Sequence, residues 1–184
     1  MTNFDIENEL APNLGTNEKL LWTGRPKAGI VFRGSDAFLI PFSLLWGGFA
    51  IFWETNVFAT DGPFFFKLWG IPFILVALYI TVGRFFVDAK KRANTIYGVT
   101  HDRIIIKSGI FSREIKSLNI RTLSDITIDQ KGDNSGTITI GPTDLRSSMM
   151  QGIEWPGAKQ PPRLELIEDV KTVYDKIIDL QRQK

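Results

Sequence analysis

The residues of this sequence that could do chemistry are few, and they lack the partners that catalysis requires. His101 is the only histidine and there is no cysteine, which excludes histidine relays, thiolate nucleophiles and cysteine metal sites. His101 is expected in an exposed turn, and the acids Glu168 and Asp169 on the solvated face of a helix. No phosphate loop, zinc-protease motif, nucleophile elbow or dinucleotide fingerprint is present. We therefore expect no enzyme activity, no catalytic residue, no cofactor and no metal site.

A second kind of chemistry is the attraction of anionic lipid headgroups. Its candidates are four basic residues that follow an apolar run: Arg84, Lys90, Lys91 and Arg92. Each such residue near a membrane surface contributes ~1 kcal/mol of attraction. Two interpretations are open, because these residues could bind lipids nonspecifically or serve only to orient a membrane segment. The formal net charge is only +2, so no nucleic-acid partner is expected.

Apolar side chains in polar surroundings are the remaining candidates, as contacts for a protein partner. Trp22 could dock at a membrane interface, or it could be buried by an extended strand that joins a domain. Met149, Met150 and Trp155 lie in the long loop 142–162. Loops of this length either carry function or contain an unrecognised strand. We expect a strand within it, and otherwise an apolar contact for a partner or lipid.

Two uncharged, aromatic-rich runs, at 37–53 and 68–83, precede or flank most of these candidate residues and set where they lie. A bilayer core needs about 20 apolar helical residues. The runs therefore predict a transmembrane hairpin within residues 36–87, with helices at about 36–54 and 64–86. Such runs exclude most classes of soluble enzyme.

Small residues in the first run form a candidate packing face. Ser43 and Gly47 are spaced as small-xxx-small, with Gly48 beside them. Two alternatives remain open for this face. It could pack against the second helix of the same chain, or against a helix of another copy.

Basic residues beside the runs predict the orientation of the hairpin. Lysines and arginines collect on the cytoplasmic side of membrane helices. They flank the outer ends of both runs here, whereas the connecting loop contains Glu54 and Asp61. Both termini are therefore expected in the cytoplasm.

The second half of the sequence alternates like a small antiparallel β domain. The predicted strands are 95–100, 103–107, 110–118, 124–129 and 137–141, with a hairpin turn at 131–136. The domain ends in an amphipathic helix, because apolar residues repeat there at helical spacing. These residues are Leu166, Ile167, Val170, Val173, Tyr174, Ile177 and Ile178.

Four segments together resemble the bacterial pleckstrin-homology (PH) domain family, in its membrane-anchored members with two transmembrane helices. The segments are EKLLWTGRPKAGI from residue 18, YGVTHDRIIIKSGIFSREIKSLNI from 97, GTITIG from 136 and LELIEDVKTVYDKI from 164. The resemblance implies an antiparallel β-barrel of about seven strands, closed by the C-terminal helix. Lipid-binding eukaryotic relatives hold phosphoinositides with basic residues clustered in the first hairpin. The corresponding turn, 100–103, has one acid and no such cluster.

Together these features predict a membrane-anchored α+β protein of the bacterial cytoplasmic (inner) membrane. Its expected parts are an N-terminal cytoplasmic segment at 1–35, the hairpin at 36–87 and a cytoplasmic PH-like domain at 88–184. The expected function is a protein-interaction or scaffolding module at the membrane surface, with an unknown protein or a second copy as partner. Two alternatives stay open: a sensor of anionic lipid headgroups, and an accessory subunit of a larger membrane complex.

Overall fold

The computed structural model describes residues 3–60, 63–110, 112–142 and 161–183, which form two compact units. The described residues of Ile30–Asp88 form the helical unit. The described residues up to and including Gly29, and those from Ala89 onward, together form the second unit, here called the β unit. The N-terminal segment, expected to be a part of its own, thus belongs to the same unit as the β module.

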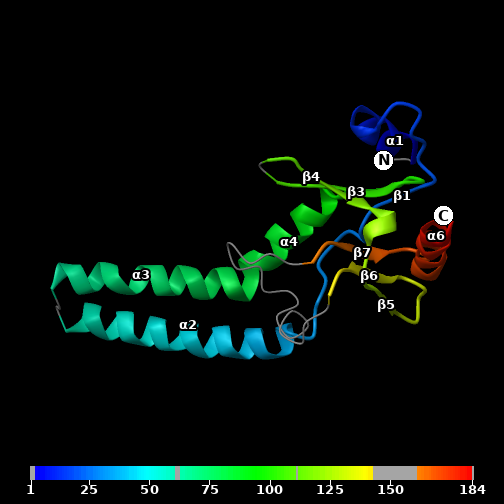
Figure 1. Ribbon diagram of the computed structural model, residues 1–184. Coiled ribbons are helices and arrows are strands. Elements are labelled where there is room, and N and C mark those ends of the chain that lie inside the picture. Colours follow the sequence, from blue (N-terminus) through cyan, green and yellow to red (C-terminus); the bar gives the residue numbers. More distant parts are fainter. Residues whose placement is uncertain (1–2, 61–62, 111, 143–160, 184) are drawn as a thin grey trace. The chain divides into compact units, whose positions relative to one another are not determined.

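The β unit contains two antiparallel sheets (Figure 1). The first sheet has the strand order β1-β2-β3-β4, and its strands are Trp22–Gly24, Ile96–Val99, Arg103–Ser108 and Glu114–Asn119. The second sheet has the order β5-β6-β7, with strands Ile126–Gln130, Gly136–Ile140 and Arg163–Ile167. The 3-10 turn Ile120–Thr122 connects the two sheets.

The expected closed barrel is wrong for the residues that the structure describes. Among the described residues, no strand of the first sheet pairs with a strand of the second. Strands β4 and β5, which precede and follow the Ile120–Thr122 turn, are both edge strands. Beyond the end of β1, the Lys27 N–H donates to the Leu166 carbonyl of β7 at 2.9 Å. The fold is therefore an open pair of sheets.

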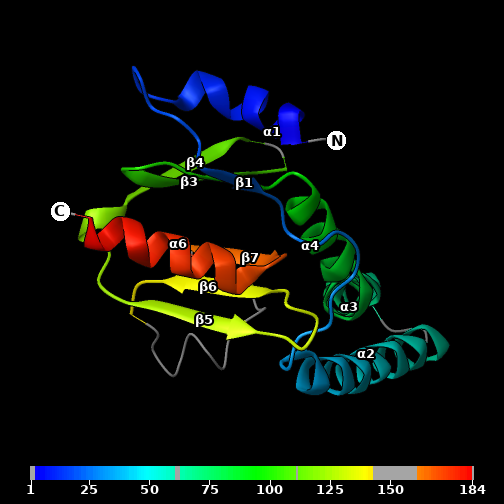
Figure 2. The same ribbon diagram turned by 90° about the vertical axis from the view of Figure 1, so that its right-hand side faces the viewer.

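The core of the β unit lies between the two sheets and the C-terminal helix α6, Val170–Arg182 (Figure 2). Its members come from both sheets and from the helix: Tyr97, Val99, Ile104, Ile106, Ile120, Ile138, Ile140, Leu164, Ile167, Val170, Val173, Ile177 and Leu180. Tyr97 links the sheets further, because its hydroxyl accepts a hydrogen bond from the Glu165 N–H at 3.0 Å. Burial raises the pKa of this hydroxyl.

A short N-terminal helix covers the other face of the first sheet. This helix, α1, spans Asn3–Leu10, and a 3-10 turn at Ala11–Asn13 follows it. Figure 2 shows α1 lying over the first sheet. The α1 side chains Ile6 and Leu10 form a second small core with Ile96 and Ile105. Strands β2 and β3 are thus buried on both faces, which explains why β3 is apolar at three consecutive positions instead of alternating.

The seventh strand and the start of the last helix differ from the prediction. Leu166 and Ile167 belong to β7, and the helix begins only at Val170. Leu166 and Asp169 have φ of 47° and 46°, so the chain leaves the strand through left-handed backbone that a helix cannot contain. Glu168 and Asp169 lie in this turn and are exposed. The strand expected within 142–162 falls largely on residues outside the described ones.

The helical unit is an antiparallel hairpin (Figure 1). Helix α2 spans Asp36–Ala59 and α3 spans Phe64–Leu78, which continues through a π-helical turn, Tyr79–Gly83, into α4, Arg84–Ala93. Each helical stretch, Asp36–Ala59 and Phe64–Ala93, is long and apolar enough to cross a membrane by length and composition. Both helices are longer than predicted, because the polar residues after Trp53 continue α2.

Candidate functional site

The two hairpin helices meet along a seam of small and polar side chains. Ser43 and Gly47 of α2 are both buried in this seam. A Cβ added to Gly47 would lie 2.9 Å from the Ala77 Cβ of α3. The Ser43 hydroxyl lies 2.9 Å from that of Thr81. The predicted small-residue face therefore packs against the second helix of the same chain at Ser43 and Gly47, whereas Gly48 faces open space.

This difference between neighbouring glycines gives a matched pair of variants. We expect Gly47→Leu to lower the stability of the hairpin by roughly 1–3 kcal/mol, because the added side chain overpacks the contact with Ala77. Gly48→Leu should change it by less than about 0.5 kcal/mol, since nothing lies within 4 Å of its Cβ position. Unfolding of the full chain in detergent, followed by circular dichroism, measures both; equal losses would contradict this packing.

Paired charges occupy one end of the hairpin. The guanidinium of Arg84 lies 2.7 Å from the buried carboxylate of Asp36 and donates to the Ile80 carbonyl at 2.7 Å. Arg33 and Asp88 form a second pair at 3.3 Å. Asp36 also accepts from the Arg33 backbone N–H at 2.6 Å. These contacts tie the start of α2 to the region where α4 begins.

The four basic residues predicted to face lipid differ in their local surroundings. Arg84 is bound to Asp36 in the helical unit. Arg92 is buried in the β unit, where its guanidinium donates to the Gly29 carbonyl at 2.7 Å. Lys90 is exposed and Lys91 is half-buried. The lysines thus remain the better candidates for lipid contact.

Trp22 was expected either at a membrane interface or in an extended strand that joins the domain, and the structure places it in such a strand. Trp22 lies in β1 opposite Val99 of β2, half-buried against the core. Its ring covers Gly24, where a Cβ would overlap it. Met149, Met150 and Trp155, the other predicted partner contacts, lie outside the described residues.

The tip of the β2-β3 hairpin holds an ion pair that the sequence analysis missed. Both carboxylate oxygens of Glu18 accept from the Arg103 guanidinium, at 2.8 Å and 2.6 Å. Arg103 also donates to the Asn13 carbonyl at 2.9 Å, and the Thr100 hydroxyl donates to Glu18 at 2.8 Å. The hydrogen bonds from Arg103 lower the pKa of Glu18 to about 2. The arginine at this tip is therefore already neutralised by the chain itself.

This pair predicts a loss of stability in acid. The pKa of Glu18 is lower in the folded chain than its ordinary 4.5, so its contribution is complete above that pH and is lost as the pH falls toward 2. The shift corresponds to ~3 kcal/mol, and partial exposure of Arg103 reduces our expectation to ~2 kcal/mol. Glu18→Gln should cost this much at pH 7 in urea unfolding of the full chain, and the difference from wild type should shrink below pH 4.5.

The exposed acid Glu7 provides the control for this experiment. Glu7→Gln should leave the unfolding free energy within about 0.5 kcal/mol of wild type. A Glu18→Gln penalty that stayed constant from pH 7 to pH 3 would contradict the role assigned to the ion pair.

These elements define a two-sheet α+β domain with a C-terminal helix, interrupted after its first strand by an apolar helical hairpin. Comparison with known proteins agrees with that class. The Bacterial PH domain family matches residues 38–177, which is more than half of the chain. The chain belongs to the bacterial PH domain family.

Other comparisons add little to this assignment. A crystal structure of a DUF1696 family protein with a pleckstrin-homology domain, from Shewanella loihica PV-4, covers 98% of each chain with 12% identity and a TM-score of 0.42. No curated protein matches the chain.

Proposed function

We propose that this protein is a non-enzymatic interaction module of the bacterial cytoplasmic membrane, anchored by its hairpin with the PH-like domain in the cytoplasm. The carrying observation is the pairing of β1 with β2, in which Trp22, Thr23 and Gly24 lie opposite Val99, Gly98 and Tyr97. The whole hairpin lies between these two strands in the sequence. Both of its ends must therefore be on the same side of any membrane that it crosses.

The surface of the hairpin supports the membrane placement. Large apolar side chains cover it, and Leu45, Phe64 and Phe38 are 75%, 74% and 71% exposed. Water-exposed patches of this extent are rare in soluble monomers, whereas lipid tails solvate them well. Basic residues flank the two outer ends and are lacking in the connecting loop, which favours the cytoplasmic side for the domain.

Two features of the β unit favour a protein partner over a lipid headgroup. Arg103, the basic residue at the first hairpin, is engaged by Glu18, so this tip offers no open basic pocket. Strand β4 is an edge strand, and its Ile115 is 44% exposed. An unpaired strand edge can bind an extended segment of another protein through backbone hydrogen bonds. We place the partner on this edge.

Alkaline phosphatase fusions test the anchoring. We expect a fusion after residue 58 to be active, because the phosphatase would be exported, and a fusion after residue 184 to be inactive. Reporter activity in intact cells should differ by more than about tenfold between them. The reverse pattern would contradict the orientation, and two inactive fusions would contradict the membrane crossing.

Site-specific photocrosslinking in native membranes tests the partner. A photoreactive side chain at position 115 should give one dominant protein adduct, whereas position 168, exposed in the turn before α6, should give none. Equal labelling from both positions, or lipid adducts alone, would overturn the strand-edge proposal and favour a lipid sensor.

A further inference from the structure

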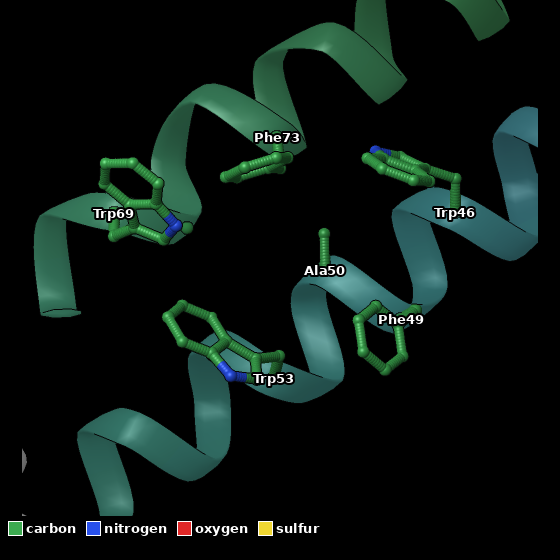
Figure 3. A pocket seen from close by; sticks show the side chains of 7 residues that line it. Trp46, Phe49, Ala50, Trp53, Trp69 and Phe73 are labelled. Atoms are coloured by element: carbon green, nitrogen blue, oxygen red, sulfur yellow. The ribbon is translucent and has the colours of Figure 1, made fainter.

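A cavity of about 300 Å³ lies in the helical unit, between α2 and α3. Figure 3 shows tryptophan and phenylalanine rings from both helices around it, with Ala50 between them. None of the described residues that line it is charged, so its walls suit lipid tails of many kinds and identify no particular ligand. The open edge of the first sheet is more specific, because its side chains carry both signs of charge.

The outer side of β4 presents backbone groups at alternate residues. The Ile120 N–H donates to the Asp102 carbonyl at 2.9 Å, in the same register that pairs β3 with β4. In an antiparallel ladder every second residue exchanges backbone hydrogen bonds with the same neighbouring strand. The even-numbered residues of Glu114–Asn119 therefore bond to β3, whereas odd-numbered ones such as Ile115 and Ser117 point their N–H and C=O groups away from the sheet.

The side chains along this edge are exposed and self-complementary. Every residue of β4 except Leu118 is exposed, and Ile115 is 44% exposed. Glu114 and Lys116 lie on the same face of the strand, with 3.5 Å between the carboxylate and the ammonium group. Charged residues on an edge usually discourage pairing with another strand. Opposite charges two positions apart, however, allow an antiparallel copy of the strand to place each charge opposite its counterpart.

We propose that the partner at this edge is a second copy of the chain, bound by antiparallel pairing of the two β4 strands about a twofold axis at Ile115. This assignment rests on the strand-edge site of the proposed function. Ile115 then lies opposite the same residue of the second copy, and the two exchange backbone hydrogen bonds. Glu114 of each copy lies opposite Lys116 of the other, at the closely spaced pairs where opposing side chains approach most.

Other registers of the same two strands do not oppose unlike charges. Only registers centred on an odd-numbered residue bring the outward backbone groups of both strands together. Centring on Ser117 places Lys116 opposite Leu118, and centring on Arg113 places two positive charges against each other. Centring on Asn119 runs past the end of the strand. Edge strand β5 contains no basic residue, so no self-pairing there opposes unlike charges either.

Backbone hydrogen bonds supply the affinity of this pairing, and the charges select its register. Exposed ion pairs contribute little affinity, whereas like charges on the shared face would oppose association. In the membrane placement proposed above, both copies are confined to one bilayer. Confinement raises their effective concentration and allows a short strand to pair.

Cysteine crosslinking of the full chain in native membranes tests the register. The chain has no cysteine of its own, so any disulfide joins introduced residues. Under mild oxidation, Ile115→Cys should form a linked dimer, because the Cα atoms of directly opposed residues lie within disulfide range. Ser117→Cys is the matched control, since it is exposed on the same strand. Its two copies would lie four positions apart, or ~14 Å along the strands, and should crosslink at least about tenfold less.

Charge reversal in the Ile115→Cys background gives a second readout. Glu114→Lys places only positive charges on the shared face and should reduce the linked dimer several-fold. Adding Lys116→Glu opposes unlike charges again and should restore the dimer. Equal crosslinking of Ile115→Cys and Ser117→Cys, a stronger Ser117→Cys dimer, or no effect of Glu114→Lys would overturn the twofold pairing.

Failure of this pairing and failure of the proposed function are distinguishable. Capture of a different protein by a photoreactive side chain at position 115, without an Ile115→Cys dimer, would overturn self-pairing and leave the strand-edge site in place. Absence of both products would overturn the strand-edge site itself. Reporter fusions, which test the anchoring, do not depend on β4.

Discussion

Replacing residues 30–88 by a short glycine-serine linker should give a folded, soluble β unit, whereas a fragment that begins at residue 89 should remain unfolded. Without the N-terminal segment, β2 loses its partner β1, and Ile96 and Ile105 lose the cover of α1. The linker variant retains both. Its new junction is short, because the Arg92 guanidinium lies 2.7 Å from the Gly29 carbonyl.

Circular dichroism and urea unfolding measure this difference. The linker variant should unfold cooperatively, and the fragment should show no transition. Leu10→Asp in the linker variant tests the contact of α1 with the sheet, since Leu10 at the end of α1 is fully buried, and it should cost about 2–5 kcal/mol. Cooperative unfolding of the fragment with a similar free energy would show that the N-terminal segment contributes nothing to the fold.

Breaking the Asp36–Arg84 pair should destabilise the hairpin strongly, whereas removing both charges should not. Either Asp36→Leu or Arg84→Leu leaves one charge buried without its partner, because Asp36 is 4% exposed and the Arg84 side chain 15%. Each single variant should lose about 3–5 kcal/mol, and the double variant should lie within about 2 kcal/mol of wild type. Unfolding of the full chain in mixed detergent measures all three.

Lys90→Leu provides the control for this cycle, because Lys90 is an exposed member of the same basic segment. It should stay within about 0.5 kcal/mol of wild type. Additive losses in the double variant would mean that the two charges act independently, contrary to the 2.7 Å contact.

Segments with their own periodicity were predictable. The turn at 131–136 joins β5 and β6, as its composition indicated, with Gln130 opposite Gly136. The helical repeat from Val170 onward was also right. Leu166 and Ile167 were misassigned because their spacing fits a helix as well as a strand, and only the left-handed backbone at Leu166 and Asp169 separates the two.

The remaining features depend on residues far apart in the sequence. Helix α1 contributes only Ile6 and Leu10 to a core, too few for a periodic signal. Glu18 and Arg103 are 85 positions apart, and no sequence motif around either residue indicates that the two form a pair. Arg84 and Arg92 belonged to one basic segment by sequence, but their side chains find separate partners in the folded chain. The burial of Glu54 likewise could not be predicted, because it depends on the packing of its side chain against Gly70 of the opposite helix.

The insertion of the hairpin after β1 also constrains how the chain is made. Ribosomes synthesise β1 first, but its partner β2 follows only after both apolar helices have been completed. Folding of the domain must therefore wait for the hairpin. In the membrane placement proposed above, a chain in which one helix crossed the bilayer and the other did not would have β1 and β2 on opposite sides, and the first sheet could not form. Assembly of the sheet would then depend on correct insertion, and chains that fail to insert would remain unfolded substrates for proteolysis.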